Sequence, residues 1–323
     1  ARMQIYANPH RGNASAIAVP SDTPYPSDDL QRPVALINTW PEAGVTALQS
    51  VPGLAPVAHL DVKDERTRMG LGSFKALGAA YVIGCDAAAG RAAGQTYVTA
   101  SAGNHGLSVA FGAQSFGAKA VIYISNTVPE GFAERLRARG AEVRREGDIY
   151  EDSMAAAAQA AEDNNWQLLS DSSWEGYYER PHRLMEGYLT LMSEVFDQIE
   201  DMPSHIFLQA GVGGLATACA VAARAEWGDG PTIIVVEPEA APALMASVQA
   251  GKSVVAPGPV SCMGRLDCKE PSLIALKGLA RDAAGLATTP SGGAGGVALM
   301  RADGRFGLSE TSRVLCILSE APE

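Results

Sequence analysis

From Thr96 onward, short apolar segments alternate with longer helix-like segments, and glycine turns separate them. Apolar runs of this length are typical of buried strands, and the longer segments have the length of helices. Strands that alternate with helices form parallel sheets with right-handed crossovers. We therefore expect an α/β fold, with strands at 96–100, 120–125, 141–145, 168–170, 205–209, 232–237 and 314–319.

The helices expected between these strands cover 107–116, 129–139, 152–162 and 183–199, and a further helix ends near Trp227. The first fifty-odd residues have a different character, because prolines interrupt them repeatedly. These prolines are Pro20, Pro24, Pro26, Pro33, Pro41, Pro52 and Pro56. We expect this region to be an arm on the surface rather than a domain of its own.

Composition excludes several classes of protein. The 323 residues are 47% apolar, enough for a sizeable core, and the net charge is −11 with no basic block. Phosphate backbones are bound by cationic surfaces, so a nucleic-acid partner is not expected. No run approaches the ~18 apolar residues of a membrane span. The five cysteines are scattered without a CxxC pair, which indicates reduced thiols, a cytoplasmic protein and no metal site, although Cys262 and Cys268 leave a metal pair open.

Residues 210–215 form a glycine turn between an apolar strand and an alanine-rich helix. Glycines let backbone amides approach an anion, and the helix N-terminus adds partial positive charge. A phosphate is the ligand that such a turn favours. No GK[ST] follows, so it is no P-loop, and the spacing to Glu237 fits a dinucleotide fingerprint badly. A tight turn without a ligand remains the alternative.

Lys75 stands among small and apolar neighbours in the segment 73–81. Burial lowers the pKa of an amine, which makes a lysine competent to form a Schiff base. The alternative is a lysine whose stem packs on the surface while its amine reaches water. A second polar turn, 101–106, lies at the carboxyl end of a predicted strand, where open α/β sheets bind their ligands.

Together these residues resemble the fold type II, or tryptophan-synthase-β-like, pyridoxal-phosphate enzymes. The resemblance is carried, in order along the chain, by 73–75, 101–106, 211–215 and 318–320. Within that superfamily, three further segments are similar to the diaminopropionate ammonia-lyases: 170–177, 185–188 and 263–271. The resemblance implies two doubly wound parallel-sheet lobes with the cofactor between them. We expect 96–165 to form the small lobe, and 1–95 with 166–323 to form the large lobe that binds pyridoxal 5′-phosphate.

The resemblance also implies roles for single residues. Lys75 would hold the cofactor covalently and transfer protons, and Asn104 would hydrogen-bond the ring hydroxyl. Ser319 would face the pyridine nitrogen. The phosphate would be held by the turn made of Gly211, Val212, Gly213, Gly214 and Leu215.

The substrate-facing residues implied by the resemblance are Ser101, His105 and Asp171. Ser101 and His105 belong to the loop that would receive the substrate carboxylate, although His105 could equally pack the turn. Asp171 would meet the second amine of a diamino acid or move a proton; its alternative is a turn residue before Trp174. Asp267 and Glu270 could contact and hold the residues that line the pocket.

Two features depart from the ammonia-lyase pattern. At the position of Ala102 the pattern usually carries an aspartate, and the form found here is common in L-serine and L-threonine dehydratases. The chain is also shorter by about a loop near 84–94 and near 282–290, which leaves open a trimmed relative or missing loops.

The resemblance as a whole implies β-elimination of ammonia from a small L-amino acid, 2,3-diaminopropionate or a close relative, giving a 2-oxo acid and ammonia. An L-serine/L-threonine-type dehydratase is the first alternative, and an inactive binding protein with the same fold is the second. A homodimer is expected from the resemblance alone.

Overall fold

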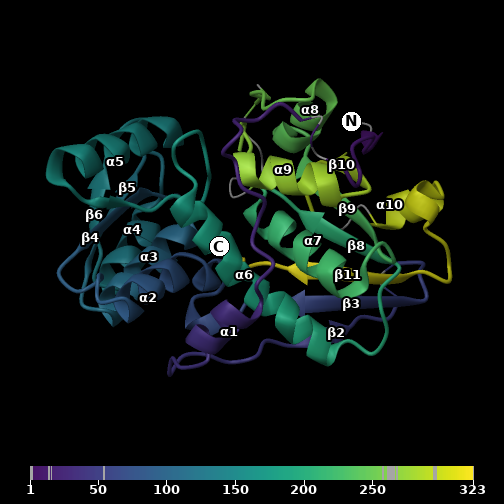
Figure 1. Cartoon of the computed structure of the whole chain (residues 1–323), viewed down its shortest axis with the longest axis horizontal. Coiled ribbons are helices and arrows are strands. Elements are labelled where there is room, and N and C mark those ends of the chain that lie inside the picture. The colour runs from purple at the N-terminus through teal and green to yellow at the C-terminus, as the bar shows by residue number, and fades with distance from the viewer. Residues whose placement is uncertain are drawn as a thin grey trace.

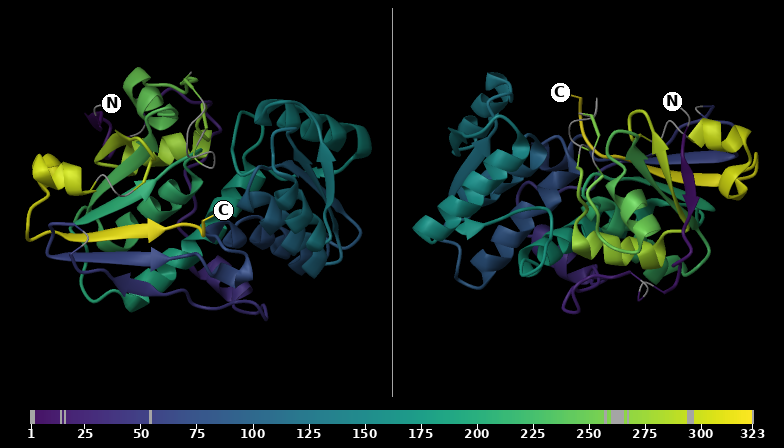
Figure 2. Two further views of the ribbon diagram at one scale, coloured as in Figure 1. Left: turned by 180° about the vertical axis from the view of Figure 1, so that it is seen from behind. Right: turned by 90° about the horizontal axis from the view of Figure 1, so that it is seen from above.

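The computed structural model describes residues 3–13, 15, 17–53, 55–256, 258–259, 266, 268–293 and 297–322. Its two lobes each contain one sheet, and Figure 1 shows them side by side with helix α6 (Glu179–Gln198) between them. The C-terminal end of the chain also lies between the lobes (Figures 1 and 2). No helix among the described residues is long and apolar enough to cross a membrane.

The larger sheet has seven strands. In spatial order they are β1 (Ile5–Ala7), β10 (Gly285–Thr289), β9 (Thr232–Pro238), β8 (His205–Gln209), β11 (Arg313–Leu318), β3 (His59–Asp64) and β2 (Leu48–Ser50). The five central strands are parallel, and the edge strands β1 and β2 pair antiparallel to them. The last central strand in the sequence, β11, lies between β8 and β3, as the view from behind shows (Figure 2).

The smaller sheet has four parallel strands. In spatial order they are β6 (Glu142–Arg145), β5 (Lys119–Ile124), β4 (Thr96–Ala100) and β7 (Gln167–Leu168). Because β5 and β7 lie on opposite sides of β4, the chain changes direction across the sheet at the carboxyl end of β4. Ligands of open α/β sheets bind at such a point. The division into 1–95 with 166–323 and 96–165 stays a prediction; the four strands of this sheet lie within 96–168.

Helices cover both faces of both sheets. In the small lobe α5 (Tyr150–Asn164) packs on one face of the sheet and α3 (Asn104–Ser115) on the other, with α2 (Ala79–Ala88) packed against α3. In the large lobe α7 (Gly214–Trp227) and α9 (Leu273–Asp282) share one face, and α10 (Val297–Ala302) lies on the other. The remaining helices are α1 (Gln31–Ile37), α4 (Glu130–Ala138) and α8 (Ala243–Ala250). The predicted α/β fold with two doubly wound lobes is therefore confirmed.

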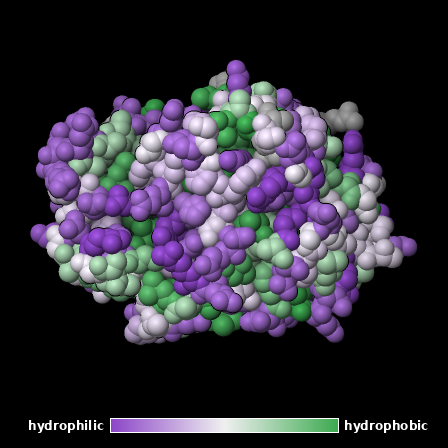
Figure 3. Space-filling view, in the orientation of Figure 1, coloured by the Kyte–Doolittle hydropathy of each residue, from purple (hydrophilic) through white to green (hydrophobic). Residues whose placement is uncertain are grey.

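Polar and apolar side chains are interspersed over the face shown in Figure 3.

The N-terminal region departs from the prediction of an arm alone. Residues 3–13 and 17–50 contribute the edge strands β1 and β2 of the larger sheet, and helix α1 between these strands contacts α6 and α2. The central strand β3 was not predicted, because its sequence His-Leu-Asp-Val-Lys-Asp carries charges that normally face water. Lys63 in β3 is fully buried, and its Nζ donates to Glu194 of α6 at 2.9 Å.

A buried ion network fixes the segment that leads to Lys75. Arg68, whose side chain is 2% exposed, donates to Glu65 and Glu194 at 2.9 Å, and Thr46 donates to Glu65. With Lys63, two cations and two carboxylates balance one another. A buried charge without a partner is strongly unfavourable, so the network holds β3, α6 and the turn after Arg68 in one arrangement.

Candidate active site

Three segments meet where parallel strands end. The turn 210–215 follows β8, Ser319 follows β11, and the turn 101–103 follows β4. Phe74 donates its N–H to the carbonyl oxygen of Ser319 at 3.0 Å, and Ser73 pairs with Glu320 in an isolated bridge. The segment that carries Lys75 is thus attached to the end of β11 between the two lobes.

Lys75 lies on a single 3₁₀ turn, Phe74–Leu77, whose first N–H groups need a cap. Ser73 supplies it, because its Oγ accepts from the Lys75 N–H at 3.1 Å. The Lys75 side chain is 22% exposed, and its Nζ lies 2.5 Å from Oδ2 of Asp171. The structure therefore brings together the two residues that the sequence assigned to catalysis.

This ion pair corrects the expected electrostatics of Lys75. Burial is the largest single influence and lowers the pKa of the Lys75 amine, as the sequence predicted, but the charge and hydrogen bond of Asp171 together with Tyr188 and Glu320 raise that pKa above its ordinary value. Burial in turn raises the pKa of Asp171, and the charge and hydrogen bond of Lys75 lower it to well below its ordinary value. Both groups are charged at neutral pH, so a lysine that acts as a base needs Asp171 to be engaged elsewhere.

Asp171 is held by contacts on both sides of its segment. His105 of α3 donates from Nε2 to the carbonyl oxygen of Leu169 at 2.8 Å, which ties the segment to the small lobe. Two residues beyond Asp171, the hydroxyl of Ser173 pairs with that of Ser272 at 2.5 Å. Ser272 also donates its N–H to the carbonyl oxygen of Val212 at 3.1 Å. Asp171 is therefore linked to the turn 210–215 as well as to Lys75.

The turn 210–215 presents bare backbone at the start of α7. Gly213, the residue before the helix, has φ +104°, and a Cβ there would lie 2.9 Å from the Cβ of Ala275. Only glycine tolerates both conditions. The N–H groups of residues 211–215 donate to no other group in the described part of the chain. These free donors and the helix N-terminus are what a phosphate needs.

The polar turn after β4 is organised by its own side chains. Ser101 Oγ accepts from the N–H groups of Gly103 and Gly106 at 3.1 and 3.0 Å, so this hydroxyl closes the turn. The His105 ring is buried, and burial lowers its pKa and keeps it neutral. Asn104, 8% exposed, donates from Nδ2 to Oε2 of Glu320 at 2.7 Å. The proposed contacts of Ser101, His105, Asn104 and Ser319 with ligands stay predictions.

Two residues near Lys75 were absent from the predicted site. Glu320 contacts Asn104, and Tyr188 of α6 lies close to Lys75 with its hydroxyl buried. Both stand in segments that carried the family resemblance, which is the signal that could have found them. Of the residues predicted to support the pocket, Glu270 is exposed, and Asp267 lies outside the described residues, as does Cys262. The described residues contain no cluster suited to a metal ion.

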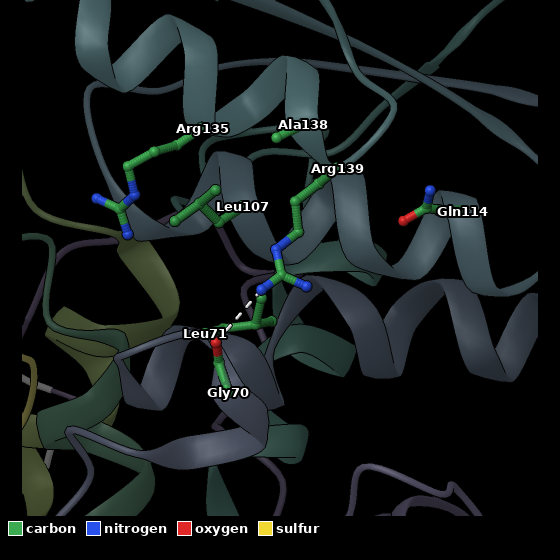
Figure 4. A pocket seen from close by; sticks show the side chains of 7 residues that line it. All are labelled: Gly70, Leu71, Leu107, Gln114, Arg135, Ala138 and Arg139. Carbon is green, nitrogen blue, oxygen red and sulfur yellow. Dashed lines mark hydrogen bonds between the residues drawn. The ribbon is translucent and has the colours of Figure 1, made fainter.

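A cavity of about 350 Å³ lies apart from these residues, between α4 and the segment before Lys75 (Figure 4). Arg139 donates across it to the carbonyl oxygen of Gly70 at 3.3 Å, and Arg135 points toward the same space. Lys75, Asp171 and the turn 210–215 are not among its lining residues. The candidate site is defined by those three features and not by this cavity.

Residues 39–283 match the family described as pyridoxal-phosphate dependent enzymes. The chain belongs to this family. It is 34% identical over 265 residues to diaminopropionate ammonia-lyase of Salmonella typhimurium, a match that covers 72% of this chain and 66% of that enzyme, just under two thirds of its length. It is 31% identical over 180 residues to the biosynthetic L-threonine dehydratase of Haemophilus influenzae, covering 55% of this chain and 33% of that enzyme.

The fold also matches a solved structure. The crystal structure of diaminopropionate ammonia-lyase from Escherichia coli in complex with an aminoacrylate–pyridoxal phosphate azomethine reaction intermediate superposes with a TM-score of 0.85. The match covers 99% of this chain and 94% of that chain at 25% identity. The chain therefore has the fold of a fold type II pyridoxal-phosphate enzyme, as the sequence predicted.

The residues present fit the family's cofactor. The free N–H groups of 211–215 offer a site for its phosphate, and Lys75 offers the amine that would hold it covalently. The amide of Asn104, fixed by Glu320, has a second N–H available for the ring hydroxyl. Pyridoxal phosphate is the cofactor that this set of groups accommodates.

Proposed function

We propose that this enzyme eliminates the β-amino group of L-2,3-diaminopropionate or a close relative as ammonia. Hydrolysis of the remaining α-imine by one water then gives a 2-oxo acid and a second ammonia. When bound, pyridoxal phosphate supplies the electron sink that makes the α-proton of an amino acid acidic. Lys75 holds the cofactor by its amine and later, as a free amine, takes the α-proton. The N–H groups of 211–215 bind the phosphate, Asn104 the ring hydroxyl, and Ser319 the pyridine nitrogen.

One observation favours a diamino acid over serine or threonine. Asp171 brings an ionised, largely buried carboxylate to within 2.5 Å of the Lys75 ammonium. A carboxylate in that place would pair with the second ammonium of 2,3-diaminopropionate, whereas the hydroxyl of serine gains no such charge pair. The turn containing Ser101 and His105 would receive the substrate carboxylate.

A dehydratase acting on L-serine or L-threonine is the second candidate, because Ala102 matches the dehydratase form of the turn. Steady-state rates with 2,3-diaminopropionate, serine and threonine separate the two. A kcat/KM for 2,3-diaminopropionate at least tenfold above the others supports the ammonia-lyase, and the opposite order supports the dehydratase. An absorbance band at about 410–430 nm after addition of the cofactor, as a covalent link to a lysine produces, would count against an inactive binding protein that kept the fold and lost the chemistry.

We further propose that the enzyme is a cytoplasmic homodimer whose partner is its small amino-acid substrate, without nucleic acid or membrane. Cys85, Cys219 and Cys316 are free thiols, as a reducing compartment maintains them. Sedimentation velocity of the loaded enzyme tests the dimer.

A further inference from the structure

Tyr188 has a buried hydroxyl group that makes no hydrogen bond of normal geometry with a described residue, although it lies near enough to Lys75 to interact with the amine. Its side chain is 1% exposed. Two other tyrosines are equally buried, and both are paired: Tyr81 donates to Glu186 and Tyr97 donates to Asp86, each at 2.6 Å. Buried hydroxyls are nearly always hydrogen-bonded. Those of Thr190, Thr217 and Thr289 are also unpaired in the described part of the chain, but Tyr188 is the one whose charged neighbours include Lys75 and Asp171.

The position of Tyr188 accounts for these neighbours. Its ring packs edge-on against Phe74, with the ring centroids 4.9 Å apart. Oη lies 3.0 Å from the point where a Cβ of Gly78 would be, and Cε2 lies 3.4 Å from the same point on Gly214. The hydroxyl is therefore next to the 3₁₀ turn of Lys75 on one side and the start of α7 on the other.

Close packing of α6 creates this position. A Cβ on Gly187 would overlap the carbonyl oxygen of Leu77, so only glycine lets α6 approach the Lys75 turn at this point. The next residue along α6 is Tyr188. The approach places an uncharged polar group beside a lysine that otherwise has one hydrogen-bond partner, Asp171, in the described part of the chain.

The charged groups that influence Tyr188 are Lys75, Asp171 and Glu320. Burial raises the pKa of Tyr188 above its ordinary value, so the hydroxyl is uncharged at neutral pH and can accept a hydrogen bond through its oxygen. An amine that donates N–H to this oxygen keeps its lone pair free for a proton. Tyr188 is thus suited to orient the Lys75 amine without neutralising it as a base.

We propose that Tyr188 is a positioning residue whose hydroxyl accepts a hydrogen bond from the Lys75 amine whenever that amine leaves Asp171, as it does when it reacts with the cofactor or when substrate occupies Asp171. The proposal rests on the function proposed above, in which the second ammonium of the substrate pairs with Asp171. The Lys75 ammonium and the second ammonium of the substrate repel each other when both lie beside Asp171. Lys75 must therefore lose either its proton or its hydrogen bond to Asp171. Tyr188 then holds the amine in place.

The test compares Tyr188→Phe with Tyr81→Phe, which removes a hydroxyl from an equally buried ring. In Tyr188→Phe we expect kcat to fall at least tenfold with KM within about threefold, a change of about 1.4 kcal/mol in transition-state stabilisation. The limb of the kcat pH profile due to the lysine should move to lower pH by at least about half a unit, because the hydroxyl dipole no longer stabilises the ammonium. Tyr81→Phe should leave both quantities unchanged.

Unfolding in urea provides the second readout. Tyr188→Phe should keep or raise the unfolding midpoint, because it removes an unpaired hydroxyl, while Tyr81→Phe should lower it by leaving Glu186 short of a partner. Wild-type kcat and pH profile in Tyr188→Phe, or a loss of stability equal to that of Tyr81→Phe with activity per folded molecule retained, would overturn the proposal.

Recombination with the cofactor separates this proposal from the function on which it rests. After the cofactor is removed with hydroxylamine, the rate at which added pyridoxal phosphate regains its absorbance reports the Lys75 amine and involves no amino-acid substrate. A slower rate with a shifted pH dependence in Tyr188→Phe supports the proposal even if 2,3-diaminopropionate is not turned over. An unchanged rate and pH dependence contradicts it.

Discussion

Lys75 and Asp171 are 96 residues apart in the sequence, yet Nζ of the lysine lies 2.5 Å from Oδ2 of the aspartate. The lysine belongs to a turn fastened to the end of β11, and the aspartate to a segment fastened by His105 and Ser272. Because both lobes contribute to these anchors, the distance between Lys75 and Asp171 depends on how the lobes are placed. The first two predictions concern this ion pair.

Replacing Lys75 with alanine should abolish turnover while the fold survives. The variant should still bind pyridoxal phosphate through the free N–H groups of 211–215, but borohydride should no longer fix the cofactor to the protein. Mass spectrometry after reduction measures this. In the control variant Lys119→Ala, which changes an exposed lysine, borohydride should still fix the cofactor to the protein as in the wild type. Cofactor trapped on Lys75→Ala would mean that another lysine forms the link.

Asp171→Asn tests the substrate class. A partly buried carboxylate that meets a second ammonium contributes about 2–4 kcal/mol, on the order of 10²–10³ in kcat/KM. The variant should lose that factor with 2,3-diaminopropionate and much less with serine. Glu175→Gln, the same exchange at an exposed position of the same segment, should change neither. Equal losses on both substrates would reduce Asp171 to a structural residue and favour the dehydratase.

Glu237 predicts a pH dependence of stability. Its side chain is fully buried, and burial raises its pKa to about 8 although the N–H groups of Leu244 and Met245 bind the carboxylate at 2.7 and 2.9 Å. The folded chain therefore binds this proton more tightly than the unfolded chain, whose carboxyl has the ordinary value of 4.5. The contribution of Glu237 to stability is full below that value and is lost as pH rises toward about 8, by up to about 1.4 kcal/mol per pH unit.

Urea unfolding between pH 5 and pH 8 measures this slope, and Glu237→Gln should flatten it. The amide also loses part of the cap on α8, about 1–2 kcal/mol, so the slope and not the absolute stability is decisive. Glu142→Gln, an exposed carboxylate on β6, serves as the control. The assignment fails if Glu237→Gln and Glu142→Gln have the same slope as the wild type.

The sequence predicted those elements whose local pattern agrees with their final environment. Strands β4, β5, β8, β9 and β11 are short apolar runs, and each lies within a residue or two of its predicted bounds. Strand β3 was missed because Asp61, Lys63 and Asp64 make it look exposed, whereas ion pairs from α6 and neighbouring loops make its burial possible. Such partners are distant in sequence, so no local pattern reveals them.

The candidate site shows the same limit. The apolar neighbours of Lys75 predicted a buried amine, and its side chain is 22% exposed, but the direction of its pKa depends on Asp171, which the fold brings from elsewhere. Tyr188 was not predicted as a site residue, because the local pattern does not distinguish it from a core tyrosine. Its unpaired hydroxyl becomes visible only when the packing of Gly187 on the Lys75 turn is known.

The last prediction concerns stereochemistry and depends on Ala102. A D-amino acid bound with its carboxylate and amine in the same places presents its α-hydrogen to the face opposite that of the L-isomer. Lys75 can serve one face, so the other needs a base within hydrogen-bond reach. Ala102 lies in the turn after β4, exposed toward solvent, and its methyl group cannot move a proton. We therefore expect a strong preference for L-2,3-diaminopropionate.

Ala102→Asp should add measurable turnover of the D-isomer, because it supplies a carboxylate in the turn that receives the substrate. Ala102→Asn has the same size without the base and should add none. Chiral chromatography of the remaining substrate from a racemic mixture measures both rates in one reaction. Similar wild-type rates on the two enantiomers would show that a base already serves each face. Asp171 would then be the group to examine, since among the described carboxylates it is the one paired with Lys75.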